Sequence, residues 1–224
     1  MAPRSGKPLL FKVGESYFNE LINRSMIQPV VDNAYAIKVC RVQDMVLDMI
    51  CPLAKEENFV TILGSNDQQL SSQSNARRLA VHKGVVEEHE LTNICKPKLR
   101  SFNATRCSLQ IILMSLLPSF QVLRVLSIEN CELTEDNPCI KSLAGLHHLR
   151  HLGLRGTPIR ELPAEIGDLR FLETLDVSHT KLDGPDALPQ SVVLLGQLKC
   201  LYCDARSGHP SQPSHPSSQR NWCV

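Results

Sequence analysis

The chain has 224 residues, a formal net charge of +1, 42% hydrophobic residues and only 4% aromatic residues. The near-neutral charge excludes a bulk electrostatic attraction to nucleic acid or to an anionic membrane. A core with so few rings must consist of Leu, Ile and Val, and no apolar run is long enough to cross a bilayer. The nine cysteines lack regular spacing and the N-terminus lacks a secretory signal, so we expect a cytoplasmic protein with reduced cysteines.

Residues 1–60 are predicted to form a partial winged-helix segment of mixed α+β structure. Apolar residues on one side of 14–27 predict an amphipathic helix, and β-favouring residues over 34–42 predict a short strand. A second helix is predicted over 43–50, with Asp44 as its N-cap. A winged helix raises the possibility of DNA binding, but Lys and Arg are balanced by Asp and Glu here, so no basic stripe is expected.

Pro52 is expected to end or kink this second helix, because proline lacks an N–H and crowds the carbonyl of Asp48. The polar stretch GSNDQQLSSQSN follows soon after. It is typical of a loop, so residues 61–75 are predicted to be a linker.

Residues 76–204 repeat one eleven-residue frame, L-x-x-L-x-L-x-x-(N/C/T)-x-L, which is that of leucine-rich repeats. Two clear copies are LRHLGLRGTPI at 149–159 and LETLDVSHTKL at 172–182. The frame starts at residues 76, 99, 123, 149, 172 and 198. The first copy is weak and the last is incomplete, since Gly208 occupies its final position.

This frame predicts an α/β solenoid with a parallel sheet on its inner curve. Positions four and six of the frame point into the coil, because side chains on a strand alternate between the two faces. Position nine lies at the turn leaving the strand, where Cys107, Cys131, Thr157 and Thr180 can bond to backbone. The return segment RELPAEIGDLRFL has Leu162, Ile166 and Leu169 at helical spacing, and Pro163 can begin a helical turn there.

The remaining strand positions should face solvent on the concave side. An array of mixed polar residues there predicts a protein-binding surface, although the same residues could simply be solvated. The predicted partner-binding residues are Asn103, Thr105, Ser127, Glu129, Arg155, Asp176, Ser178 and Tyr202. Gly153 and Asp204 belong to the same outward-facing set.

Residues 205–224 are rich in Pro, Ser, His and Gln and are predicted to be a disordered tail. No metal site is expected. Cys200 and Cys203 would face opposite sides of a strand, and His147, His148 and His151 are interpreted as exposed polar residues.

The order of motifs resembles that of plant intracellular immune receptors, the coiled-coil nucleotide-binding leucine-rich-repeat class of disease resistance proteins. The resemblance is carried by GESYFNELINRSMIQPV, CRVQDMVLDMI and EENFVTIL, followed by repeats containing LPAEIGDL. It covers residues 12–204. It implies recognition of a protein in plant defence, with a pathogen effector, a guarded host protein or a full-length receptor as partner.

The same resemblance implies a nucleotide contact in the winged-helix segment. The family's Met/Val-His-Asp motif, whose histidine senses the β-phosphate of ADP, corresponds here to Val42, Gln43 and Asp44. Gln43 departs from the pattern, since an amide can donate a hydrogen bond but cannot become charged. The family's glycine-rich phosphate loop is missing, so no cofactor is expected here and a truncated, non-enzymatic receptor fragment is predicted. The alternatives are an ADP-binding switch remnant that uses Gln43 and Asp44, or a non-functional truncated product.

Overall fold

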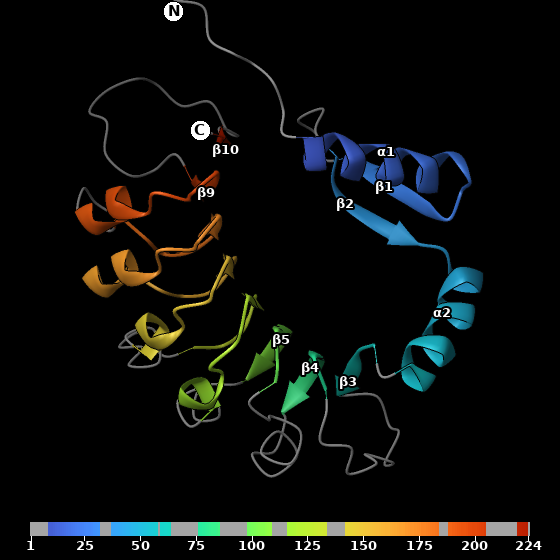
Figure 1. The fold of residues 1–224 in the computed structure, drawn as a ribbon, viewed down its shortest axis with the longest axis horizontal. Helices are drawn as coiled ribbons and strands as arrows, with labels where there is room; N and C mark the ends of the chain where they lie inside the picture. Colours follow the sequence, from blue (N-terminus) through green and yellow to red (C-terminus); the bar gives the residue numbers. More distant parts are fainter. Residues whose placement is uncertain are drawn as a thin grey trace, which may run out of the picture. The chain divides into compact units, whose positions relative to one another are not determined.

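The computed structural model describes residues 9–31, 37–57, 59–63, 76–85, 98–108, 116–133, 142–183, 188–204 and 219–223. The chain forms two compact units, residues 1–57 and residues 58–224 (Figure 1). Within the described parts, no helix is both long and apolar enough to cross a membrane.

The N-terminal unit contains two helices and a small sheet. Helix α1 (Leu9–Asn23) is followed by strands β1 (Ile27–Val31) and β2 (Ile37–Val42) and by helix α2 (Asp44–Glu56). The strands are antiparallel, with Ile27 opposite Val42. The predicted order of helix, strand and helix is confirmed, but β1 was missed. It contains Pro29, which a two-stranded sheet tolerates because both of its strands are edges.

The ends of both helices differ from their predicted positions. Helix α1 ends at Asn23 because Ser25 adopts a left-handed φ of 56°. The Ser25 and Met26 amides then donate to the carbonyls of Ile22 and Leu21 at 2.8 and 3.0 Å, which is a Schellman motif. In α2 the helix does not end at Pro52 but runs through it to Glu56, and the alternative expectation of a kink there stays a prediction. Proline removes only one N–H donor, and the helical bonding resumes beyond it.

The second unit is built on one eight-stranded sheet, seen as a curved row of strands in Figure 1. Its strands are β3 (Thr61–Leu63), β4 (Arg78–Val85), β5 (Ser101–Ser108), β6 (Val125–Glu129), β7 (His151–Gly153), β8 (Thr174–Asp176), β9 (Cys200–Asp204) and β10 (Gln219–Cys223). Strands β3 to β9 pair in parallel in chain order. Leu126, Leu152 and Leu175 lie opposite one another in successive strands, which confirms the predicted frame.

Short 3-10 helices return the chain along the outer side of the repeats. They are η1 (Leu117–Ser119), η2 (Leu143–Gly145), η3 (Ala164–Asp168) and η4 (Gln190–Leu194). Leu162, Ile166 and Leu169 are buried, as their spacing predicted, and Pro163 directly precedes η3. The core is therefore a continuous column of mostly aliphatic side chains between the sheet and these helices, and it also contains Phe102 and Phe120, whose ring centroids are 5.7 Å apart.

Two predicted segment boundaries need correction. Residues 61–63, assigned to a linker, form β3 and pair with β4. Residues 219–223, assigned to a disordered tail, form β10 and pair antiparallel with β9. The rest of the predicted linker (64–75) and of the predicted tail (205–218 and 224) lies outside the described residues. The added strands extend the sheet beyond both ends of the predicted repeat array.

Candidate protein-binding surface

The outward face of the sheet is ordered in three columns of side chains, at positions three, five and seven of the frame. Parallel pairing fixes this order: Ser101 lies opposite Val125, Asn103 opposite Ser127, and Thr105 opposite Glu129. The next strands continue the first two columns, with His151 opposite Thr174 and Gly153 opposite Asp176. Columns five and seven were predicted from the sequence, but column three was not, and it brings His151 onto this face.

Most of the predicted partner-binding residues are accessible. Asn103 is exposed, and five others are half-buried: Thr105, Glu129, Arg155, Asp176 and Tyr202. The expectation that Ser127 and Ser178 face solvent is wrong, because they are only 8% and 6% exposed. This surface therefore consists of fewer residues than the alternation of side chains alone predicts.

The two covered serines hold neighbouring carboxylates in place. Ser127 Oγ donates a hydrogen bond to Glu129 Oε1 at 3.0 Å. Ser178 donates to Asp176 Oδ1 twice, from its backbone N at 2.9 Å and from its Oγ at 2.6 Å. These bonds fix the direction of two acidic groups and reduce the side-chain entropy that a partner would have to remove on binding.

The centre of the face is formed by a half-buried histidine beside a residue without a side chain. A Cβ at Gly153 would lie 3.1 Å from Ser127 Oγ and 3.3 Å from His151 Nε2, so the imidazole lies against the glycine. Burial lowers the pKa of His151, and the charges of Asp176 and Glu129 oppose that shift. The expectation of exposure holds for His147 and His148 but is wrong for His151. The centre of the face is therefore a buried glycine covered by His151 and Ser127, with the acidic groups of Glu129 and Asp176 close to the imidazole.

Four successive repeats have a left-handed residue at position eight, within β5 or just after β6, β7 and β8. Arg106, Asn130, Gly156 and His179 all have φ between 51° and 67°. The amide of Asn130 donates to the carbonyl of Arg155 at 2.8 Å, and that of Gly156 donates to the carbonyl of Ser178 at 2.9 Å. These left-handed residues therefore help to position column seven, and the repeat frame did not predict them.

Position nine supplies the predicted backbone contacts. Thr157 Oγ1 donates to the carbonyl of Leu154, and Thr180 Oγ1 donates to the carbonyl of Val177 at 2.7 Å. Cys131 Sγ donates to the carbonyl of Glu129 at 3.5 Å, and burial raises the pKa of this thiol to about 11. A thiol with that pKa stays protonated and unreactive at neutral pH, so Cys131 has a structural role.

A largely basic array that was not predicted lies at position two of the frame, just before strands β4 to β9. It comprises Arg77, Arg100, Arg124 and Arg150, followed by Glu173 and Lys199 in the next two repeats. The signal was present in the sequence as Arg directly after the first leucine-type position of four successive copies. Side-chain alternation applies only within strands, so it made no prediction for position two.

The two residues assigned to a nucleotide contact lie at the junction of β2 and α2. Gln43 is half-buried and its carbonyl accepts the Leu47 amide at 2.9 Å, so Gln43 precedes the first turn of the helix. Asp44 is exposed and is the first helical residue rather than the predicted N-cap. A phosphate contact by this pair stays a prediction.

Comparison with known proteins agrees with both units. The family described as "Leucine-rich repeat region" matches residues 98–215, and the family "Disease resistance protein Winged helix domain" matches residues 2–50. The rice (Oryza sativa subsp. japonica) disease resistance protein Pik-2 is 27% identical over 189 residues, covering 84% of this chain and 18% of its own length.

Two further relatives show the same partial coverage. Rice PIK6-NP is 30% identical over 190 residues, covering 84% of this chain and 17% of its own length. RPH8A of Arabidopsis thaliana is 32% identical over 177 residues, covering 74% of this chain and 19% of its own length. This chain spans about a fifth of the length of these relatives. It belongs to the leucine-rich-repeat disease resistance proteins of plants.

Proposed function

We propose that this chain acts in plant defence by binding a protein partner on the concave face of its repeats. The relatives are named as disease resistance proteins, and the leucine-rich-repeat family model matches residues 98–215 of this chain. The observation that carries the proposal is the ordered outward face, where accessible polar residues of successive strands lie side by side in fixed columns. Extended concave faces of this kind are how repeat proteins contact other proteins.

The composition of the face supports recognition rather than catalysis. Arg155 and Tyr202 are residue types that often dominate binding energy, and both are half-buried on this face. Gly153 and Ser127 are covered, so a partner would meet the half-buried His151 and the carboxylates of Glu129 and Asp176 at the centre of the face. We propose no reaction for this chain. The cytoplasm is the proposed location, and a pathogen effector, a guarded host protein or a full-length receptor is the proposed partner.

Proximity labelling in plant cells tests this function. The tagged wild-type chain is compared with Arg155→Glu, which reverses a charge on the concave face, and with Arg170→Glu as a matched control. Arg170 is exposed on the segment that follows η3 and lies outside the three concave columns. Thermal unfolding of each variant confirms that its repeats remain folded.

A concave-face partner should be enriched with the wild-type chain and with Arg170→Glu but lost with Arg155→Glu. Infection or expression of an effector should change the recovery of that partner. If all three chains enrich the same proteins to the same extent, the concave face is not the recognition surface.

A further inference from the structure

Three arginines at the strand entrances form a regular ladder that the proposed concave site does not use. We define the arginine ladder as Arg77, Arg100 and Arg124, which directly precede β4, β5 and β6. The Arg100 amide donates to the Arg77 carbonyl at 2.8 Å, and the Arg124 amide donates to the Arg100 carbonyl at 2.8 Å. Successive arginines are thus one strand spacing apart, about 4.8 Å at the backbone.

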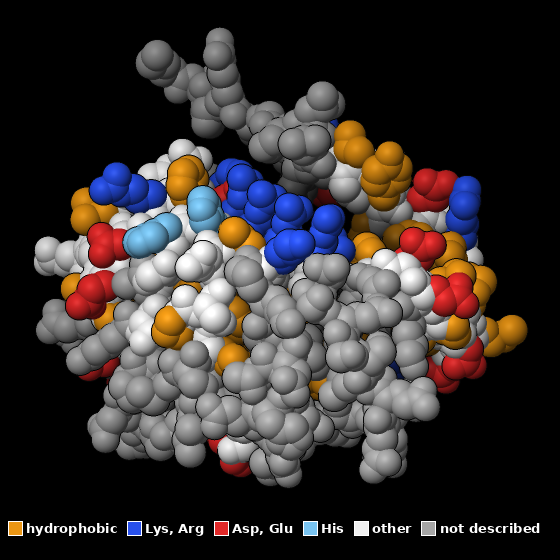
Figure 2. Space-filling view, turned by 60° about the horizontal axis from the view of Figure 1, so that its bottom comes forward, with side chains coloured by type: hydrophobic (Ala, Val, Ile, Leu, Met, Phe, Trp, Pro, Cys, Tyr) orange, Lys and Arg blue, Asp and Glu red, His pale blue; other side chains and the backbone are white. Residues whose placement is uncertain are grey.

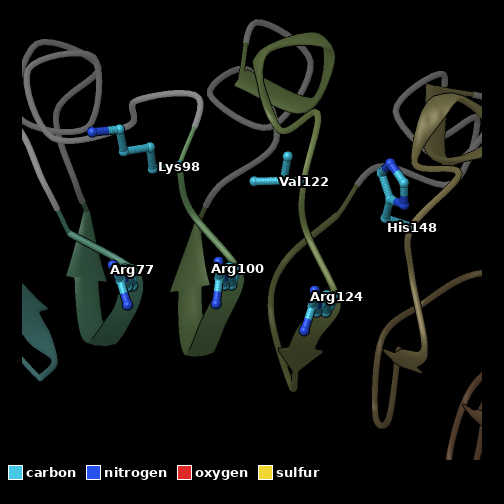
Figure 3. Close-up of a pocket in the computed structure, with 6 residues that line it drawn as sticks. All are labelled: Arg77, Lys98, Arg100, Val122, Arg124 and His148. Atoms are coloured by element: carbon cyan, nitrogen blue, oxygen red, sulfur yellow. The ribbon is translucent and has the colours of Figure 1, made fainter.

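The ladder borders a hollow at the surface. A groove of about 440 Å³ is lined by the three arginines together with Lys98, Val122 and His148. Figure 3 shows the arginine side chains in a row on three neighbouring segments, with the other three residues on the segments that lead into the strands. Figure 2 shows Lys and Arg side chains gathered on one face, with histidine beside them. Val122 is 37% exposed and adds an apolar contact point within this basic groove.

The next two repeats show how this frame position binds a carboxylate. Glu173 accepts hydrogen bonds from Arg150 on one side at 3.1 Å and from Lys199 on the other. The Lys199 hydrogen bond is the main reason that the pKa of Glu173 lies below its ordinary value. A carboxylate between two position-two cations is therefore an arrangement that this solenoid already contains.

The arginine ladder lacks such a carboxylate within the described residues, where no acidic side chain is paired with Arg77, Arg100 or Arg124. We propose that the groove binds an acidic helix of a protein partner. Carboxylates at i, i+4 and i+8 of a helix are about 5–6 Å apart, close to the strand spacing. An aliphatic side chain of the same helix would cover the exposed surface of Val122. A ligand that carries only phosphates has no apolar group for this contact.

A fluorescence anisotropy titration tests this site on the full chain. The probe is a labelled helical peptide with Glu at i, i+4 and i+8 and one Leu beside the middle Glu. We expect binding at low salt that weakens as salt is added, because the exposed charges become screened. Each of Arg77→Gln, Arg100→Gln and Arg124→Gln should weaken binding by about fivefold, the upper range for exposed ion pairs.

The matched control is Arg106→Gln, which removes the same charge from the opposite end of β5. This variant, and the concave-face variant Arg155→Glu, should bind the peptide like the wild-type chain. Circular dichroism of the ladder variants checks that a loss of binding does not reflect unfolding. A peptide with Gln in place of Glu should not bind.

Three results would overturn the proposal. The first is no binding of the acidic peptide at low salt. The second is an equal loss with Arg106→Gln and with the ladder variants, which would show an effect of net charge alone. The third is binding of inorganic tripolyphosphate that is tighter than peptide binding and equally sensitive to the ladder variants, which would assign the groove to phosphates. None of these results bears on the concave face, because the Arg155 variant reports on that face separately.

Discussion

The repeats and the N-terminal unit treat their apolar residues in opposite ways. In the repeats, Leu126, Leu152 and Leu175 are fully buried, since each strand and return helix covers its neighbour. In the N-terminal unit, Tyr17, Met45 and Met49 are more than half exposed, although their spacing is amphipathic. All buried hydrophobic residues among those described lie between 63 and 195. Stacking of repeats thus buries surface that two helices and a two-stranded sheet cannot bury by themselves.

The largest expected effect tests this contrast directly. Leu152→Ala removes a side chain with no exposed surface from the middle of the sheet and should lower the free energy of unfolding by about 3 kcal/mol. Met45→Ala in α2 removes a side chain that is 84% exposed and should change it by less than about 0.5 kcal/mol. Urea unfolding followed by circular dichroism measures both. Similar losses for the two variants would show that the units do not differ in this way.

The next largest effect on stability is expected at Gly156, one of the four left-handed residues at position eight of the repeats. Gly156 has φ of 67°, and a Cβ there would lie 2.2 Å from Asn130 Oδ1. Gly156→Ala should therefore destabilise the chain by about 2 kcal/mol, from strain and from the clash. Combining it with Asn130→Gly removes the clash and should restore part of the loss in the same unfolding assay. No recovery in the double variant would assign the whole effect to backbone strain.

A smaller change, this time a stabilisation, is expected at the C-terminal end of α1. Ser25 has φ of 56°, a conformation that glycine adopts without a Cβ conflict. Ser25→Gly should stabilise the helix end by about 0.5 kcal/mol, whereas Ser16→Gly inside the exposed helix should destabilise it by about as much. Hydrogen exchange of the α1 amides, measured by mass spectrometry, reports both changes. Faster exchange in Ser25→Gly would contradict the Schellman assignment.

The sequence predicts the repeats well because each copy supplies the same information. Leu79, Leu126 and Leu175 occupy position four, and one strand register satisfies all of them. The N-terminal unit offers no repetition. The short β1 contains Pro29, and the turn at Ser25 lacks the usual glycine, so neither was predicted.

The candidate site was predictable only as far as side-chain alternation applies. Alternation on a strand placed Asn103 and Asp176 on the outer face, but it could not show that Ser127 is covered by its neighbours. The arginine ladder was not predicted because position two precedes the strand. Outside a strand, alternation does not predict which way a side chain points. Its regularity becomes visible only when backbone pairing sets Arg77, Arg100 and Arg124 one strand apart.

The smallest expected effect is a pH dependence of stability at Glu173, the position-two residue that is paired with Arg150 and Lys199. The Lys199 hydrogen bond, with help from the charges of Lys199 and Arg150, holds the pKa of Glu173 below its ordinary value of 4.5. The folded state therefore favours the ionised form. Its contribution to stability is present above the unfolded pKa and is lost as pH falls through the lower folded pKa.

Glu173→Gln should accordingly lower the free energy of unfolding near pH 7 by a few tenths of a kcal/mol, as for other accessible ion pairs. The wild-type chain and the variant should converge in acid below the folded pKa, and high salt should reduce the difference at neutral pH. Thermal unfolding at matched pH and salt measures this. A difference that persists unchanged in acid would mean that Glu173 acts through packing, and the carboxylate bridge would then be a poor guide to what the arginine ladder binds.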